Sequence, residues 1–115
     1  MTRAAIYARY SSDLQTDASI EDQVRLCKEK AASNGWDIVE CYADHGISGS
    51  SVMLRPSVQK LIQDGMEGKY DTLIAEALDR LSRDQEDIAA IYKRMQFAGI
   101  TIITLSEGEI SNLHV

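Results

Sequence analysis

Short apolar segments alternate along this chain with stretches of helical periodicity, and this alternation restricts the fold more than any other feature. The apolar segments are residues 4–10, 36–43, 72–75 and 100–105, whereas residues 106–115 have no firm pattern. The segments are apolar on both faces, as the strands of a parallel sheet are when helices cover both of its sides. We therefore expect one α/β domain of three layers, with a largely parallel sheet of four to five strands and helices on both faces.

Capping and turn residues place a helix in each interval between these strands. Ser19 begins a segment that resembles a capping box, and Gly35 suits the left-handed position that ends a helix. Pro56 suits a first helical turn, Gly68 marks the stop of that helix, and a third helix is expected over residues 84–98. The residues expected on the buried stripes are Ile20, Val24, Cys27 and Ala31, then Val58, Leu61, Ile62 and Met66, and last Ile88, Ile91, Tyr92 and Met95.

Charge and cysteine content limit the classes of function. The net charge is −6, from 12 basic and 18 acidic residues, which argues against a nucleic-acid binder that acts alone, because such proteins usually present a basic face. Cys27 and Cys41 have no CxxC spacing, and we expect two buried thiols in a reducing cytoplasm. His45 and His114 are isolated, which argues against a metal site. No apolar run approaches the roughly 18 residues that span a bilayer, and the N-terminus lacks the pattern of a signal peptide.

Polar residues that follow the predicted strands indicate where chemistry takes place. In an open parallel sheet, sites form beyond the carboxyl ends of the strands. A serine hydroxyl needs activation before it can attack, and guanidinium groups match the charge of a phosphoryl group in transit. The residues expected to converge at this edge are Arg9, Ser11, Arg55, Arg80 and Arg83. One serine and several arginines indicate metal-free attack on a phosphodiester.

Each of these residues also has an ordinary structural explanation. Ser11 and Gln23 fit structural roles in a turn and on a helix, and Arg9 fits a surface residue whose stem packs on the sheet. Arg80 and Arg83 can pair with neighbouring acids on a solvated helix start, where such pairs contribute only about 0–1 kcal/mol. The Gly- and Ser-rich residues 46–51 lack a P-loop pattern, so a flexible loop explains them better than a phosphate cradle.

Four motifs in order nevertheless resemble one family. Residues 7–12 read Tyr-Ala-Arg-Tyr-Ser-Ser, and residues 19–23 read Ser-Ile-Glu-Asp-Gln. Asp44 is followed by Gly-Ile-Ser-Gly and later by Arg-Pro, and residues 78–84 read Leu-Asp-Arg-Leu-Ser-Arg-Asp. Together they resemble the catalytic domain of serine site-specific recombinases, the resolvase/invertase family. The loop over residues 46–56 and the region over residues 106–110 are more similar to those of the large members, which are phage integrases and transposon-borne enzymes.

The resemblance implies a mechanism for the residues at the predicted edge. Ser11 would attack a DNA phosphate, form a 5′-phosphoserine link and release a 3′-hydroxyl, with no metal, cofactor or ATP. Arg9, Arg80 and Arg83 would stabilise the charge of the transition state. Arg55 would reach in from the loop before the second helix.

The resemblance also assigns supporting roles and a domain organisation. Asp79 would position an arginine, Gln23 would support the nucleophile segment, and Gln15 is expected near the site. Tyr10 departs from the family, where valine is usual. Residues 1–115 would be an N-terminal catalytic domain, truncated before the long dimerisation helix and without the DNA-binding region, and so inactive or nearly so alone.

The full protein would then bind specific DNA sites as dimers that pair into a tetramer. It would act in the cytoplasm, encoded by a bacterium or a phage, without contact to a membrane. Two other interpretations stay open. One is a phosphatase or nuclease that uses the same serine and arginines on another substrate, and the other is an assembly domain without catalysis.

Overall fold

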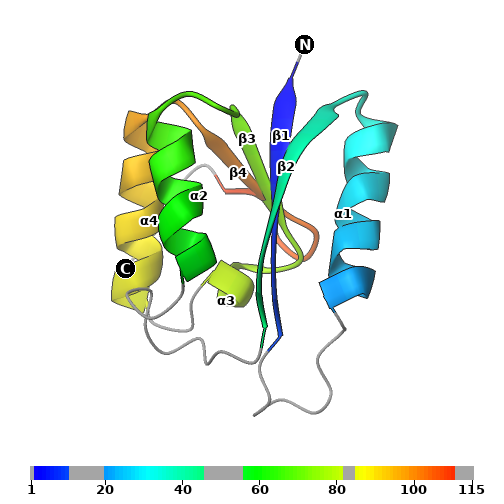
Figure 1. The fold of residues 1–115 in the computed structure, drawn as a ribbon, viewed down its shortest axis with the longest axis horizontal. Helices are drawn as coiled ribbons and strands as arrows, with labels where there is room; N and C mark the ends of the chain where they lie inside the picture. The colour runs from blue at the N-terminus through cyan, green and yellow to red at the C-terminus, as the bar shows by residue number, and fades with distance from the viewer. Residues whose placement is uncertain (1, 11–19, 46–55, 82–84, 111–115) are drawn as a thin grey trace.

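Nine helices and strands make up the part of the chain that the computed structural model describes, which is residues 2–10, 20–45, 56–81 and 85–110 (Figure 1). They are β1 (Arg3–Tyr10), α1 (Ile20–Ser33), β2 (Asp37–His45), α2 (Pro56–Met66), β3 (Thr72–Ala75), α3 (Leu78–Leu81), α4 (Gln85–Phe97), β4 (Thr101–Thr104) and β5 (Gly108–Ile110). The predicted strands and the three longer helices are all present, with ends that differ by a few residues.

The strands form one sheet in the order β2-β1-β3-β4-β5, in which the first four strands are parallel and β5 is antiparallel to β4. Helix α1 covers one face, and α2 and α4 cover the other (Figure 1). The predicted three-layer α/β fold is therefore confirmed. The two ladders of β1 differ in length, because its pairing with β3 ends at Tyr7 opposite Ala75, whereas its pairing with β2 continues to Tyr10.

The core lies on both faces of the sheet, because successive side chains of β1 point to opposite sides. Ala4 and Ile6 pack with Cys27 of α1, whereas Ala5 and Tyr7 belong to the larger cluster under α2 and α4. Burial of these side chains is the main stabilising contribution, at roughly 25 cal/mol per Å² of apolar surface removed from water.

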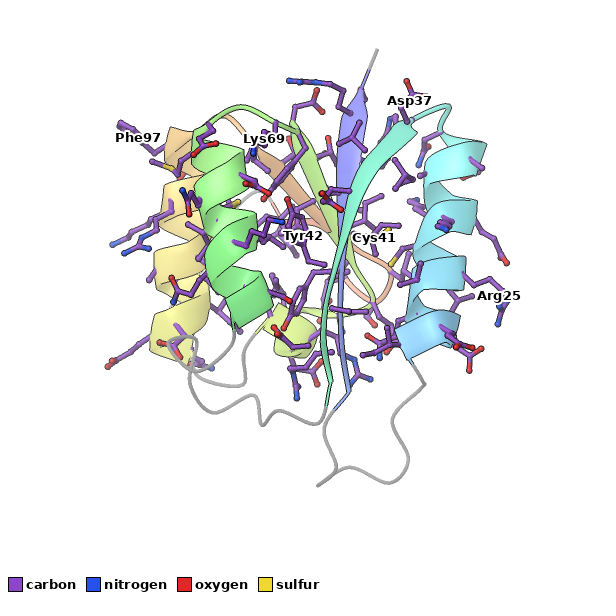
Figure 2. All side chains as sticks on the ribbon, viewed as in Figure 1. Arg25, Asp37, Cys41, Tyr42, Lys69 and Phe97 are labelled. Atoms are coloured by element: carbon purple, nitrogen blue, oxygen red, sulfur yellow. The ribbon has the colours of Figure 1, made fainter. Side chains whose placement is uncertain are left out.

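Polar side chains are also buried between β2 and α2. The Tyr42 hydroxyl donates to Asp64 Oδ2 at 2.6 Å, and Lys69 Nζ lies 3.3 Å from the other carboxylate oxygen. The Tyr70 hydroxyl donates to the carbonyl oxygen of Leu61 at 2.6 Å. Figure 2 shows Tyr42 in the space between the sheet and α2. The hydrogen bond from Tyr42 and the charge of Lys69 hold the pKa of Asp64 below its ordinary value, although burial opposes this shift.

Two glycines explain local geometry that another residue would not allow. Gly35 follows α1 with φ +72°, and the next amide, of Trp36, donates to the carbonyl of Ala31 at 2.9 Å, which closes the helix end. Gly65 lies in the last turn of α2, where an added Cβ would come within 2.6 Å of Ile100 Cδ1 and 2.9 Å of the Tyr70 hydroxyl. The absent side chain therefore lets α2 approach its neighbours.

Some sequence predictions are wrong. Met66 is 48% exposed, because Asp64 and Gly65 form the buried face of the last turn of α2. Cys41 is exposed on β2, an edge strand of the sheet, so only Cys27 is a buried thiol. The patternless C-terminal region contains β5, which pairs with β4 after a short turn. Among the described residues, no helix is long and apolar enough to cross a membrane.

Candidate active site

The ends of β1 and β2, the first turns of α1 and α2, and the short helix α3 lie at one edge of the sheet, the lower edge in Figure 1. This is the edge at which the sequence predicted a site. The structure brings together Arg9, Gln23, Asp79 and Arg80 there. The other predicted site residues, which lie outside the described residues, are Ser11, Arg55 and Arg83, together with the neighbouring Gln15 and the proposed cap Ser19.

Gln23 fixes the backbone of Arg9, two residues before Ser11. Its Oε1 accepts from the Arg9 amide at 3.2 Å, and its Nε2 donates to the Arg9 carbonyl at 3.0 Å. Arg9 lies two residues beyond the end of the β1–β3 ladder. There the side-chain amide of Gln23 bonds both the N–H and the carbonyl of Arg9, as the main chain of a neighbouring strand residue would. Gln23 is fully buried. Gln23 thus holds the main chain at the end of β1, and its support of a nucleophile segment stays a prediction.

The Arg9 side chain ties β1 to α3. Its Nε donates to the carbonyl oxygen of Arg80 at 3.1 Å, and its Nη2 donates to that of Asp79 at 2.9 Å. Arg9 is completely buried, which corrects the alternative of a surface arginine. The guanidinium is stabilised there by carbonyls at the C-terminal end of α3, because such carbonyls carry partial negative charge. Asp79 contacts Arg9 through its main-chain oxygen, while its side chain is exposed, so this contact does not depend on the carboxylate and the expected role of Asp79 stays a prediction.

Arg80 makes a contact that was not predicted from the sequence, in which two of its nitrogens share one carboxylate oxygen of Glu76. Its Nε and Nη2 both donate to Glu76 Oε1, at 3.2 and 2.8 Å, and its side chain is only 10% exposed. Glu76 lies directly after β3, four residues before Arg80. The available signal was the spacing of opposite charges four residues apart, although Glu76 itself lies before α3 and the contact spans the residues that lead into the helix.

Asp44, the last acidic residue of β2, anchors the start of α2. Its Oδ2 accepts from the Tyr7 hydroxyl at 2.8 Å, and its Oδ1 accepts from the Ser57 amide at 3.2 Å. The Ser57 hydroxyl in turn donates to the carbonyl of Ala43 at 2.7 Å. The end of β2 and the beginning of α2 are therefore held together at the base of the segment that contains Arg55.

The turn between β4 and β5 supports α3 from the other side. Glu107 Oε1 accepts from the Leu78 amide at 3.4 Å and from the Thr104 hydroxyl at 2.5 Å. The Ser106 amide and hydroxyl both donate to the Glu76 carbonyl, at 3.0 and 3.1 Å. Helix α3 is thus held at its start by this turn and at its end by Arg9.

One cysteine lies close to this network. Burial raises the pKa of the Cys27 thiol to about 12, and the negative charge of Glu76 adds to the effect. The thiol is therefore protonated at neutral pH and is a poor nucleophile there. The chemistry that this edge offers is instead that of cationic side chains held next to the end of β1, an arrangement suited to an anionic substrate.

Comparison with known proteins places the chain in a family. Residues 4–114 match the family model "Resolvase, N terminal domain". A putative DNA recombinase of Bacillus subtilis (strain 168) is 33% identical over 110 residues, which are 94% of this chain and 21% of that protein. The transposon Tn552 resolvase of Staphylococcus aureus is 32% identical over 101 residues, 88% of this chain and 45% of that protein. The chain therefore spans less than half the length of either relative.

Solved structures agree with this match. The N-terminal catalytic domain of TP901-1 integrase superposes with a TM-score of 0.85 at 32% identity, covering 96% of this chain and 82% of that one. A resolvase family site-specific recombinase from Streptococcus pneumoniae gives a TM-score of 0.82 at 27% identity, covering 98% and 78%. The match spans all the elements that carry the site, and the chain belongs to the resolvase N-terminal domain family.

Proposed function

We propose that this chain is the catalytic domain of a serine site-specific recombinase, which cuts DNA strands and rejoins them to new partners. Its family and the recombinase, resolvase and integrase names of its relatives support this function. Because the chain spans 21% and 45% of two relatives, we propose that it works within a longer protein that supplies DNA binding and assembly into dimers and tetramers.

In the proposed reaction, the Ser11 hydroxyl attacks a backbone phosphorus of DNA. The bond from phosphorus to the 3′ oxygen breaks, that oxygen takes up a proton, and the DNA 5′ end becomes a phosphoserine ester. A 3′-hydroxyl of another strand then attacks this ester and releases Ser11. One phosphodiester bond is exchanged for another through an ester of similar energy, so the reaction needs no ATP. The proposal assigns stabilisation of the transition-state charge to arginines instead of a metal ion.

The observation that carries this proposal is the pair of arginines beside the segment that leads to Ser11. Gln23 fixes the Arg9 backbone two residues before the serine, and Arg9 holds the helix that carries Arg80. The buried charge of Arg9 acts through a medium of low dielectric constant, where its effect on developing negative charge is larger than in water. Arg80 would bind the phosphate oxygens, with Arg55 and Arg83 completing the set.

Trapping of the covalent intermediate tests this function. Full-length recombinase carrying this domain is incubated with a DNA site nicked near the exchange point, and protein–DNA adducts are separated by denaturing electrophoresis. We expect Ser11→Ala to abolish the adduct and the matched variant Ser12→Ala to retain it. Adduct at the normal yield in Ser11→Ala would exclude this serine as the nucleophile. Turnover of small phosphate esters without any adduct would instead favour a phosphatase.

The arginines are tested in the same assay. Because removal of one group that stabilises transition-state charge costs about 10²–10³ in rate, we expect Arg80→Ala and Arg83→Ala each to slow cleavage by that order while the fold is retained. Unchanged cleavage in either variant would remove that arginine from the mechanism.

A further inference from the structure

Glu76 is an acidic residue whose side chain bonds directly to an arginine of the candidate active site. One of its carboxylate oxygens accepts from two nitrogens of Arg80, at 2.8 and 3.2 Å, and its side chain is only 21% exposed. Charged hydrogen bonds of this geometry are about twice as strong as neutral ones. The pair therefore differs from the exposed pair of Arg25 and Glu29 on α1, whose side chains are 61% and 62% exposed.

The main chain of Glu76 is itself held in place. Its carbonyl accepts from both the amide and the hydroxyl of Ser106, which connects it to the residues after β4. Glu76 also directly follows Ala75, the last residue of the central strand β3. The carboxylate thus projects from a fixed point, so the direction of the Arg80 guanidinium is set by the sheet rather than by α3 alone.

Charge balance gives Glu76 a second effect. Arg9 is completely buried, and its Nε bonds the main-chain oxygen of Arg80, which brings two cationic residues into one poorly solvated region. Like charges in such a region repel each other and are costly to bury. The Glu76 carboxylate offsets the positive charge of Arg80 in this region.

We infer that Glu76 is a positioning residue for the phosphoryl-transfer reaction. It orients Arg80 toward the DNA phosphate and does not itself touch DNA. This role rests on the proposed function, because it concerns the same site. Its effect is exerted on the rate of the chemical step at saturating DNA, not on the affinity for DNA.

A double-mutant cycle in the full-length recombinase tests this inference. First-strand cleavage at saturating nicked DNA, and DNA affinity by mobility shift, are measured for Glu76→Ala, Arg80→Ala and the double variant. Misplacing a catalytic group by about 1 Å can cost about 10²-fold, so we expect Glu76→Ala to slow cleavage by about 10- to 100-fold with affinity unchanged within about twofold. The double variant is expected to cleave no more slowly than Arg80→Ala.

Matched variants separate positioning from folding. Glu29→Ala removes the acid of the exposed pair on α1 and is expected to cleave at the normal rate. Glu76→Gln keeps an oxygen that accepts from Arg80 but lacks the charge, so its cleavage rate is expected between those of wild type and Glu76→Ala. It also provides the test if the alanine variant does not fold.

Two kinds of result have different consequences. Cleavage by Glu76→Ala or Glu76→Gln at or above the normal rate, or a further loss when Glu76→Ala is added to Arg80→Ala, would overturn the positioning role alone. Absence of a serine-linked adduct in the wild-type protein would overturn the proposed function, and the role of Glu76 with it.

Discussion

Replacing Gln23 by methionine probes the contact that fixes the main chain of Arg9, two residues before the proposed nucleophile Ser11. Methionine has a similar volume and fills irregular space well, but it cannot bond the Arg9 amide or carbonyl. Each buried group that loses its partner costs about 1–3 kcal/mol. With both Arg9 groups affected and Gln23 completely buried, we expect the free energy of unfolding to fall by about 2–5 kcal/mol.

Thermal unfolding followed by circular dichroism measures this loss. For a domain of this size, 1 kcal/mol corresponds to about 4 °C, so the melting temperature of Gln23→Met is expected to fall by roughly 8–20 °C. The matched control is Gln63→Met, at an exposed position of α2 where the side-chain amide bonds only an exposed carboxylate at 3.3 Å. Equal melting temperatures for the two variants would show that the amide of Gln23 does not satisfy buried main-chain groups.

A charged variant sharpens the same test. In Gln23→Glu the carboxylate still accepts from the Arg9 amide, but when ionised it cannot donate to the Arg9 carbonyl. Burial and the nearby carbonyl favour the protonated form, so the pKa of the introduced carboxyl group in the folded variant is expected above its unfolded value of about 4.3. Its stabilising contact is therefore fully present below about pH 4.3 and is lost as the pH rises through the folded pKa. Stability relative to wild type is expected to improve toward acid pH, and a constant difference would contradict the donor role.

Three further predictions concern the rest of the fold. Because Tyr42 holds the pKa of Asp64 below its ordinary value, that carboxylate contributes stability above about pH 4 that is lost as the pH falls through the folded pKa. In Asp64→Asn, the free energy of unfolding measured in urea is therefore expected to depend less on pH in this acid range. An unchanged pH dependence would contradict this prediction. Iodoacetamide at pH 8 is expected to modify Cys41 in the native protein and Cys27 only after unfolding, because Cys27 is buried and its pKa is raised to about 12. Detection of two adducts on the native protein by mass spectrometry would be inconsistent with this prediction. Gly65→Ala is expected to lower stability by about 1–3 kcal/mol in the same unfolding assay, because its methyl group would overlap two packed side chains.

The elements that the sequence predicted correctly are those with strong local signals. Strand β3 was predicted with its observed bounds, and α2 begins at Pro56 as expected from the fixed φ of proline at a first turn. The predicted helix ends at Gly35 and Gly68 coincide with positive φ angles of 72° and 79°. In each case the deciding interaction lies within a few residues of the chain, so a local pattern suffices.

Elements that are stabilised by residues distant in the sequence were not predicted, because no local pattern indicates them. Strand β5 has only three residues and is held by pairing with β4. Helix α3 has four residues, too few to be stable by its own hydrogen bonds. It depends instead on Glu107 at one end and Arg9 at the other, and neither contact can be read from the residues of α3 themselves.

The same distinction applies to the candidate site. The sequence predicted that Arg9 and Arg80 share an edge of the sheet and that Gln23 supports the segment after β1, but not that one network connects them. That network runs from Ser106 through Glu76 to Arg80, from the Arg80 carbonyl to Arg9, and from the Arg9 backbone to Gln23. The network joins residues from four parts of the fold. A substitution in α1 or after β4 that breaks one of its hydrogen bonds is therefore expected to shift the residues before Ser11, even where the packing of the core is unchanged. Substitutions at Gln23 and Ser106 are therefore expected to alter cleavage together with stability, whereas equally destabilising substitutions within α2, such as at Gly65, would lower stability alone.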